Sequence, residues 1–405
     1  MKARVLLIAA SLLVGACSKQ GMVDFAISGA HRPGRAPAQV APWGGETYRV
    51  LAGDLHCHVS PPDHPSHVTR SFEQTVELAR SEGLDFAVLT PHVWSRFFES
   101  PDLRQLAVAW QRQLEKDIAG QEGATTLFIP GFEYSDASWG HVGLSFADVE
   151  RVLQDLPVKE AQSHPERFVD AWVRHGGMIV LNHPLQTPLD SMFSESKADL
   201  SFRPYTAPGP FPEEINAFRR HAHGLEAFNL TASRLRDRWI LHDAEAGLRS
   251  VLHLLDQEIL VQQRMIAATG GSDSHGSQLR ATLFVLARDK SRESIRDAIR
   301  SGRTCVRDPL ACTLMARPAG GGVGVVAGGS LTGVSSIEVM VQGSDAELIV
   351  NSQVVSRSIS STPVRLDVPA QCSVLRARSG QGFSGPIEIN CPFASARADG
   401  AAQGR

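Results

Sequence analysis

The 405-residue sequence predicts an α/β fold followed by a small antiparallel β domain. Short apolar runs alternate with helical runs over most of the chain, which is typical of βαβ units and favours a parallel arrangement of strands. From about residue 311 the pattern changes to short alternating runs separated by Gly and Ser, such as 336–341 and 364–368. That texture is typical of a β-sandwich.

The first βαβ unit is expected between residues 49 and 90. Residues 49–59 have the pattern of a short buried strand that runs out into a loop. Residues 71–83 have helical spacing, and Gly83 is expected to end that helix. Residues 84–90 form a second apolar run. Further helices are expected at 102–118, 165–175, 242–264 and from 294, and further strands at 126–132, 139–144, 178–181, 224–229 and 265–269.

Most of these apolar strands end in His, Glu or Asp. In α/β barrels the active site lies at the carboxyl ends of the strands, so this pattern predicts a shared site there. In Asp54-Leu55-His56-Cys57-His58, residues two apart face the same side of a strand, so His56 and His58 present two imidazoles together. Such a pair suits a divalent ion such as zinc or manganese.

The ordered set of these residues resembles the PHP (polymerase and histidinol phosphatase) family over about residues 49 to 306. The segment 298–306 is similar to the carbaryl-hydrolase-like branch. The resemblance implies a distorted seven-stranded (β/α) barrel that holds two to three divalent ions (Zn, Mn or Fe). It implies His56, His58, Glu133 and Asp273 for the first ion, Glu133, His141 and His183 for the second, and His64, His92 and His275 for the third.

The resemblance further implies a hydroxide between the first two ions as nucleophile, with Glu133, Asp273, His275 and His92 as catalytic residues. Asp54 and Asn182 are expected to support the ligands, Asp54 by orienting an imidazole. Pro91 stands where the family usually has an acidic residue, so a carboxylate that would support the third ion is missing. His67 is the alternative to His64.

Phosphoester hydrolysis is the reaction expected from the family, while carbamate, ester or amide cleavage stays open. Trp94, Arg96 and Arg280 are candidate substrate contacts, and residues 186–218 are expected to form a cap over the site. One rival is an amidohydrolase-type TIM barrel, and another is a non-catalytic metal-binding envelope lipoprotein. A net charge of −3 without a basic stripe argues against a specific nucleic-acid partner. The oligomeric state leaves no signal in the sequence.

The N-terminus predicts a lipid anchor. A basic start and a short apolar run lead to Leu13-Val14-Gly15-Ala16-Cys17, which resembles a bacterial lipobox, with a plain secretory signal as the alternative. The resemblance implies cleavage before Cys17, lipid on its thiol and a place in the cell envelope facing the periplasm, with Ser18 favouring the outer membrane. The expected segments are a signal peptide (1–17), a tether (18–46), a metallohydrolase domain (47–310), a β domain (311–395) and a tail (396–405).

Five cysteines remain after the lipobox. Cys57 is expected to be buried, whereas the pairing among Cys305, Cys312, Cys372 and Cys391 stays open.

Overall fold

The computed structural model describes residues 38–94, 100–121, 125–156, 158–185, 201–232, 244–276, 278–342, 346–359 and 361–393. The expected signal peptide with Cys17, most of the tether, Arg96, residues 186–200 of the expected cap and the tail lie outside them. In the described segments, no helix is both long and apolar enough to cross a membrane.

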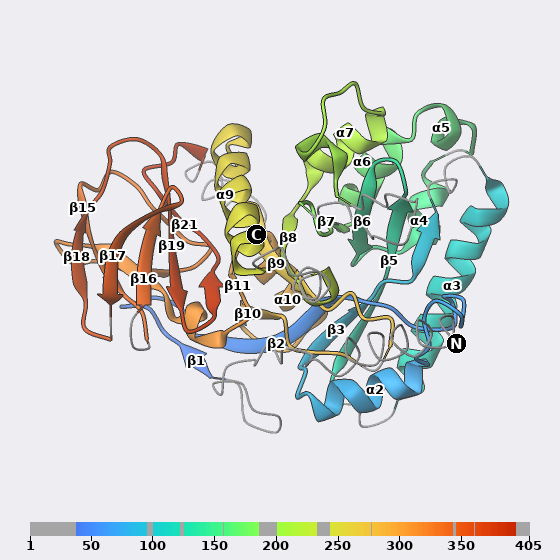
Figure 1. Cartoon of the computed structure of the whole chain (residues 1–405), viewed down its shortest axis with the longest axis horizontal. Coiled ribbons are helices and arrows are strands. Elements are labelled where there is room, and N and C mark those ends of the chain that lie inside the picture. Colours follow the sequence, from blue (N-terminus) through green and yellow to red (C-terminus); the bar gives the residue numbers. More distant parts are fainter. Residues whose placement is uncertain are drawn as a thin grey trace, which may run out of the picture.

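A mixed sheet forms the centre of the first part of the chain (Figure 1). Its strands pair in the order β2 (Tyr48–Cys57), β3 (Phe86–Leu89), β5 (Leu127–Asp136), β6 (Gly140–Ser145), β7 (Met178–Leu181), β8 (Gly224–Asn229) and β9 (Ala267–Gly271). An isolated parallel bridge joins Cys57 to Ser274, so the segment after β9 returns to the end of β2. The seven-stranded barrel itself stays a prediction.

Strand β6 is antiparallel to both of its neighbours, which differs from the expected parallel arrangement. The reason is the length of the connection, because only residues 137–139 join β5 to β6. A parallel pair needs a crossover of a dozen or more residues, whereas a hairpin needs a few. The short strand β4 (His92–Trp94) pairs with β5 in parallel and starts at His92.

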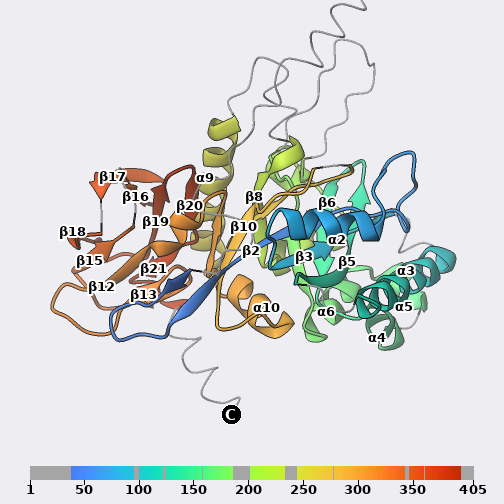
Figure 2. The same ribbon diagram turned by 90° about the horizontal axis from the view of Figure 1, so that it is seen from below.

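Helices follow the apolar periodicity closely. They are α2 (Phe72–Ser81), α3 (Pro101–Ala119), α4 (Val149–Gln154), α5 (Val158–Ser163), α6 (Glu166–Arg174), α7 (Glu213–His221), α9 (Ala244–Gln262) and α10 (Arg292–Arg300), with the 3-10 turn η2 at Arg203–Tyr205. Helix α2 starts with a capping box between Ser71 and Gln74, which satisfies two backbone donors at its N-terminus. Seen from below, α2 crosses in front of β3 and β5, whereas α10 and α3 lie on the lower side of the view (Figure 2).

Part of the expected tether belongs to the folded body. Strand β1 (Gln39–Val40) pairs antiparallel with β2 at Tyr48 and Arg49. Val40 is buried, and apolar burial supplies the energy that holds a segment of otherwise loop-like composition. The expected boundary at residue 46 is therefore too far along the chain.

The chain after α10 forms two packed sheets. Strands β12 (Met315–Pro318), β13 (Val325–Val326), β15 (Ser336–Met340) and β18 (Val364–Asp367) form one of them. The other contains β14 (Ser330–Leu331), β16 (Ala346–Val350), β17 (Gln353–Ile359), β19 (Ser373–Ser379), β20 (Gly382–Ser384) and β21 (Ile387–Ile389). One apolar cluster joins the two, with Ile337 and Val339 from the first and Leu348 and Leu375 from the second.

The second of these sheets is continuous with the first part of the chain. β20 pairs with β11 (Thr304–Val306), β11 pairs with β10 (Leu283–Ala287), and β10 pairs with β2. Disulfides join Cys305 to Cys312 and Cys372 to Cys391, and Cys57 is a buried free thiol.

Candidate metal centre

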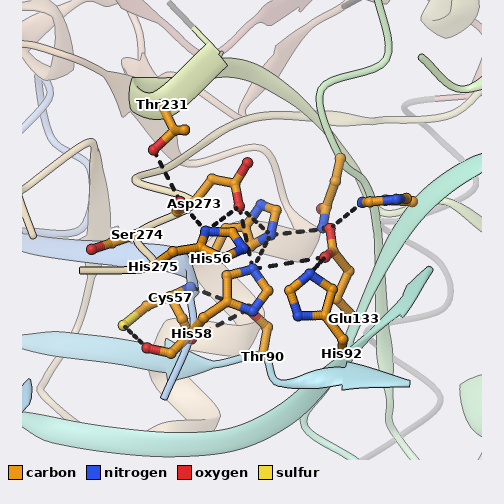
Figure 3. Close-up of polar contacts among 12 residues, drawn as sticks. His56, Cys57, His58, Thr90, His92, Glu133, Thr231, Asp273, Ser274 and His275 are labelled. Atoms are coloured by element: carbon orange, nitrogen blue, oxygen red, sulfur yellow. Dashed lines mark hydrogen bonds and ion pairs between the residues drawn. The ribbon is translucent and has the colours of Figure 1, made fainter. Parts of the chain in front are cut away.

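The strand ends converge on one cluster of imidazoles and carboxylates (Figure 3). Its members come from β2, β4, β5 and β6 and from the segments that follow β2, β7 and β9. Eight of the nine predicted ligands lie in three groups that could each hold an ion, and two of the groups share His58. The groups are His56, His58 and Asp273; Glu133, His141 and His183; and His58, His92 and His275.

The three side chains of the first group, together with Glu133 of the second, point ligand atoms at a common centre. Nε2 of His56 lies 3.2 Å from Nε2 of His58, 3.4 Å from Oδ1 of Asp273 and 3.0 Å from Oε1 of Glu133. Nε2 of His58 lies 3.2 Å from Oδ1 of Asp273. Ligand atoms at zinc-like distances from a tetrahedral ion would be about 3.3–3.6 Å apart. The donor atoms therefore already have the spacing that an ion requires.

The other ring nitrogens fix which atoms face that centre. Nδ1 of His56 lies 3.1 Å from Oε1 of Glu226, and Nδ1 of His58 lies 3.1 Å from Oδ2 of Asp63. An ionised carboxylate only accepts hydrogen bonds, so each Nδ1 carries the proton and donates it. In the neutral rings, both Nε2 lone pairs then face each other and two further carboxylate oxygens. Four acceptors in a buried space repel one another unless positive charge lies between them.

The pKa shifts of the four side chains also indicate that positive charge stabilises this cluster. Burial lowers the pKa of His56 and His58, but the surrounding carboxylates outweigh it: the pKa of His56 lies well above its usual range, and that of His58 rises to about 9. Burial would raise the pKa of Glu133 and Asp273, yet the neighbouring imidazoles hold both well below the usual value. Protons or a cation can supply this positive charge, and a divalent ion supplies it at neutral pH with neutral imidazoles.

Glu133 connects the groups. Its Oε1 lies 3.2 Å from Nδ1 of His141 and 3.7 Å from Nε2 of His183, while its Oε2 lies 3.4 Å from Nε2 of His92. The amide of Asn182 donates to Oε1 at 2.8 Å. One carboxylate that reaches two donor sets is the arrangement that places two cations side by side.

The third group differs from the expectation at His64. That side chain is exposed and its Nδ1 contacts the Ser66 hydroxyl, so it lies outside the three groups. The ring of His67 lies 5.0 Å from that of His92 and 4.5 Å from that of His275. The turn after residue 63 thus turns His67, the alternative, toward the cluster and His64 away from it.

Asp63 is a buried carboxylate that the sequence reasoning missed. Its Oδ1 accepts from the backbone amide of His92 at 2.9 Å and contacts Nδ1 of the same ring at 3.0 Å, while Oδ2 serves His58. Asp63 therefore supplies, from a different loop, the carboxylate that is missing because Pro91 stands where the family usually has an acidic residue. A signal existed in the spacing, because an acid five residues after the His56-x-His58 pair was available in the loop.

Glu226 on β8 was also missed. It is buried beside His56, and its Oε2 accepts from the backbone amide of His183 at 2.7 Å. A Cβ on Gly271 would lie 2.2 Å from its Oε1 and 2.3 Å from Cβ of His56, so only glycine fits there. A single acid within the apolar run Gly-Leu-Glu-Ala-Phe was the signal that could have found it.

Two candidate ligands have unusual backbone conformations. The φ angle is +28° at His183 and +50° at Asp273, which non-glycine residues rarely adopt. Hydrogen bonds hold both, since the His183 amide donates to Glu226 and the Asp273 amide donates to the carbonyl of His56 at 2.8 Å. Strain of this kind gathers at functional sites.

Asp54 does not orient an imidazole, which corrects the expectation. Its Oδ1 accepts from the backbone amides of His56 at 2.9 Å and Ser272 at 3.0 Å, while its Oδ2 has no hydrogen-bond partner within the described residues. Burial raises its pKa to about 6. Asp54 thus joins the end of β2 to the loop that carries Asp273.

The expected substrate contacts have different outcomes. Trp94 is 58% exposed and its ring is stacked near that of His92, with centroids 6.1 Å apart, so it stands at the rim of the cluster. Arg280 instead pairs with Glu82 at the end of α2 through two contacts of 2.6 and 2.7 Å. Arg96 lies outside the described residues.

No protein-family model and no curated protein matches the chain. In fold it is similar to a two-domain protein from Bacteroides vulgatus that contains a predicted PHP-like metal-dependent phosphoesterase. That match has 16% identity over 89% of this chain and 98% of that chain, with a TM-score of 0.41. It is also similar to the lesion-specific endonuclease PfuEndoQ of Pyrococcus furiosus (17% identity, 62% of this chain, 56% of that chain, TM-score 0.34). A third similar structure is PsfC of Pseudomonas syringae (16% identity, 63% of this chain, 89% of that chain, TM-score 0.36). Because these TM-scores are low, we base the function on the geometry of the centre and on the sequence motifs.

Proposed function

We propose that this chain is a metal-dependent hydrolase of the PHP type that cleaves phosphoesters. The observation that carries the proposal is the buried set of four inward-facing acceptors formed by His56, His58, Glu133 and Asp273, at the mutual spacing of ligands to one ion. Such a set is costly to keep buried unless it binds a cation. The shared carboxylate of Glu133 supports a second ion held with His141 and His183.

Divalent ions at these positions would supply an activated water and stabilise the oxyanion that develops during hydrolysis. The chain's own residues position the ligands: Glu226 and Asp63 hold the rings of His56 and His58 through Nδ1, and Asn182 holds Glu133. The pair of adjacent ion sites favours phosphoester over carbonyl chemistry, because two such sites clamp both the attacking and leaving oxygens of an in-line displacement. Trp94 is placed at the rim, where an aromatic leaving group would stack.

The proposal also includes the cellular location of the protein. The lipobox-like run that ends at Cys17 supports export and lipid anchoring to the cell envelope, with the catalytic part facing the periplasm. Labelling with a radioactive fatty acid tests this, since a Cys17→Ser variant would take up no label.

The test of activity pairs metal content with turnover. Zinc-, manganese- and iron-loaded protein would be assayed with bis-p-nitrophenyl phosphate, p-nitrophenyl phosphate and p-nitrophenyl acetate. We expect two to three ions per chain, preference for a phosphoester, and loss of the first ion and of turnover in Asp273→Ala. A folded protein that binds no ion would refute the proposal, and preference for the acetate would replace phosphoester by carbonyl hydrolysis.

A further inference from the structure

A second concave site lies between the two parts of the chain, away from the strand ends described above. It is a cavity of about 690 Å³, within the range of small-molecule sites. Helix α9 forms one wall, and strands β16, β17, β19 and β20 form the other. Figure 1 shows α9 standing beside these C-terminal strands. Sites for small ligands occur preferentially at such junctions.

The charged residues in this cavity are unbalanced. Four arginines line it against two carboxylates, a formal excess of two positive charges: Arg249, Arg357, Arg376 and Arg378 against Asp256 and Glu347. Both carboxylates are already engaged. Glu347 contacts Arg357 at 2.6 Å and Arg378 at 3.6 Å, and Asp256 contacts Arg376 at 2.5 Å and the Ser352 hydroxyl at 2.8 Å.

Arg376 gives the strongest evidence for a missing partner. Its side chain is 1% exposed; Nε is held by Asp256 and Nη1 donates to the carbonyl of Ser384 at 3.2 Å. Nη2 has no hydrogen-bond partner among the described residues. A buried guanidinium nitrogen without an acceptor is costly, so an acceptor from a ligand would stabilise it.

Most of the remaining lining is apolar, and Ser250, His253, Gln257 and Ser352 add polar groups. Leu252 from α9, Ile349 from β16 and Phe383 from β20 face the same space. Guanidinium groups match the planar oxygens of carboxylate and phosphate, and apolar walls accommodate a hydrocarbon or aromatic body. Leu185 also lines the cavity, and its Cα lies at most about 7.6 Å from that of His183, two residues earlier. One lining residue is therefore close along the chain to the candidate metal centre.

We propose that the cavity between α9 and the C-terminal strands binds an organic anion that has an apolar body and one carboxylate or phosphate-type group. The C-terminal strands thereby complete a ligand site, a role that does not depend on the reaction at the metal centre.

The test is calorimetric titration of the zinc-loaded full chain with phenylphosphonate, benzoate and inorganic phosphate. Arg378→Gln removes a cavity cation, and Arg317→Gln is the matched control. The side chain of Arg317 is 29% exposed, paired with Glu338 and over the ring of Trp43; that of Arg378 is 30% exposed, paired with Glu347 and over Phe383. We expect at least one organic anion to bind, about tenfold more weakly in Arg378→Gln and unchanged in Arg317→Gln.

A second variant protects the test against misfolding. Arg249→Gln changes an exposed residue of α9 on the opposite wall, and we expect the same weakening. Tighter binding of phenylphosphonate or of benzoate would identify the oxyanion, and either supports the proposal. Three results would overturn it: no binding of either below about 10 mM, binding that both cavity variants leave unchanged, or inorganic phosphate binding as tightly as phenylphosphonate.

Discussion

Replacing Asp63 by asparagine tests whether this carboxylate positions the imidazoles of His58 and His92. The substitution keeps the shape and one acceptor oxygen, which can still serve His92. It replaces Oδ2 by an amide that cannot accept from Nδ1 of His58. The loss is about one charge-assisted hydrogen bond in a buried site, or about 1.5–3 kcal/mol. That corresponds to roughly a 10–150-fold weaker ion affinity, similar to the 10–100-fold loss typical of ligand-supporting residues.

The assay measures ion affinity by competition with a chromophoric chelator, together with turnover of bis-p-nitrophenyl phosphate. Asp308→Asn is the control, because Asp308 is also buried, and within the described residues its carboxylate accepts from the backbone amides of Leu310 and Gln381. We expect the control to lower thermal stability without changing ion stoichiometry. Wild-type affinity and turnover in Asp63→Asn would refute the positioning role.

Three further expectations concern other parts of the chain. His67→Ala should lose the third ion while His64→Ala keeps it, as read by elemental analysis; the reverse would return His64 to the centre. Burial holds the pKa of His223 at about 3 in the folded protein, whereas the unfolded chain binds a proton there below pH 6.5. The stability that the neutral imidazole contributes is therefore complete above pH 6.5. The free energy of unfolding falls by about 2 kcal/mol between pH 6.5 and 5. The free energy of unfolding in urea should therefore fall less with acid in His223→Asn than in the wild type. The same pH dependence in both proteins would contradict the burial of His223. Removing the Cys372–Cys391 bridge in a double serine variant should cost about 3 kcal/mol on the entropic model, and an unchanged melting temperature would show that the bridge does not form.

The sequence was a good guide where side-chain periodicity determines structure. Apolar runs located β7 and β8 to the residue and the longer helices within a few residues, because burial of one face sets both periods. It also brought together candidate ligands that directly end or follow strands, such as His56 and Asp273, since strand ends meet at one edge of the sheet.

The misses share a physical cause, which is that loop geometry is set by local turns and not by periodicity. Whether His64 or His67 faces the cluster depends on the turn after Asp63. The role of Asp63 depends on a contact with His92, 29 residues away. Glu226 was hidden by the apolar run around it, and β1 by the Gly and Pro that surround it.

The pairing of β2 determines how long this strand stays incompletely paired while the chain is synthesised. Its neighbours are β1, β3 and β10, and the last of these ends at Ala287, about 230 residues after Cys57. At typical translation speeds those residues take about 10–50 s to emerge. Throughout that interval β2 exposes a row of unpaired amides and carbonyls on an apolar strand, a template for aggregation. The yield of soluble protein should therefore depend on how long a holding chaperone stays on the first hundred residues, and slower translation should lower it.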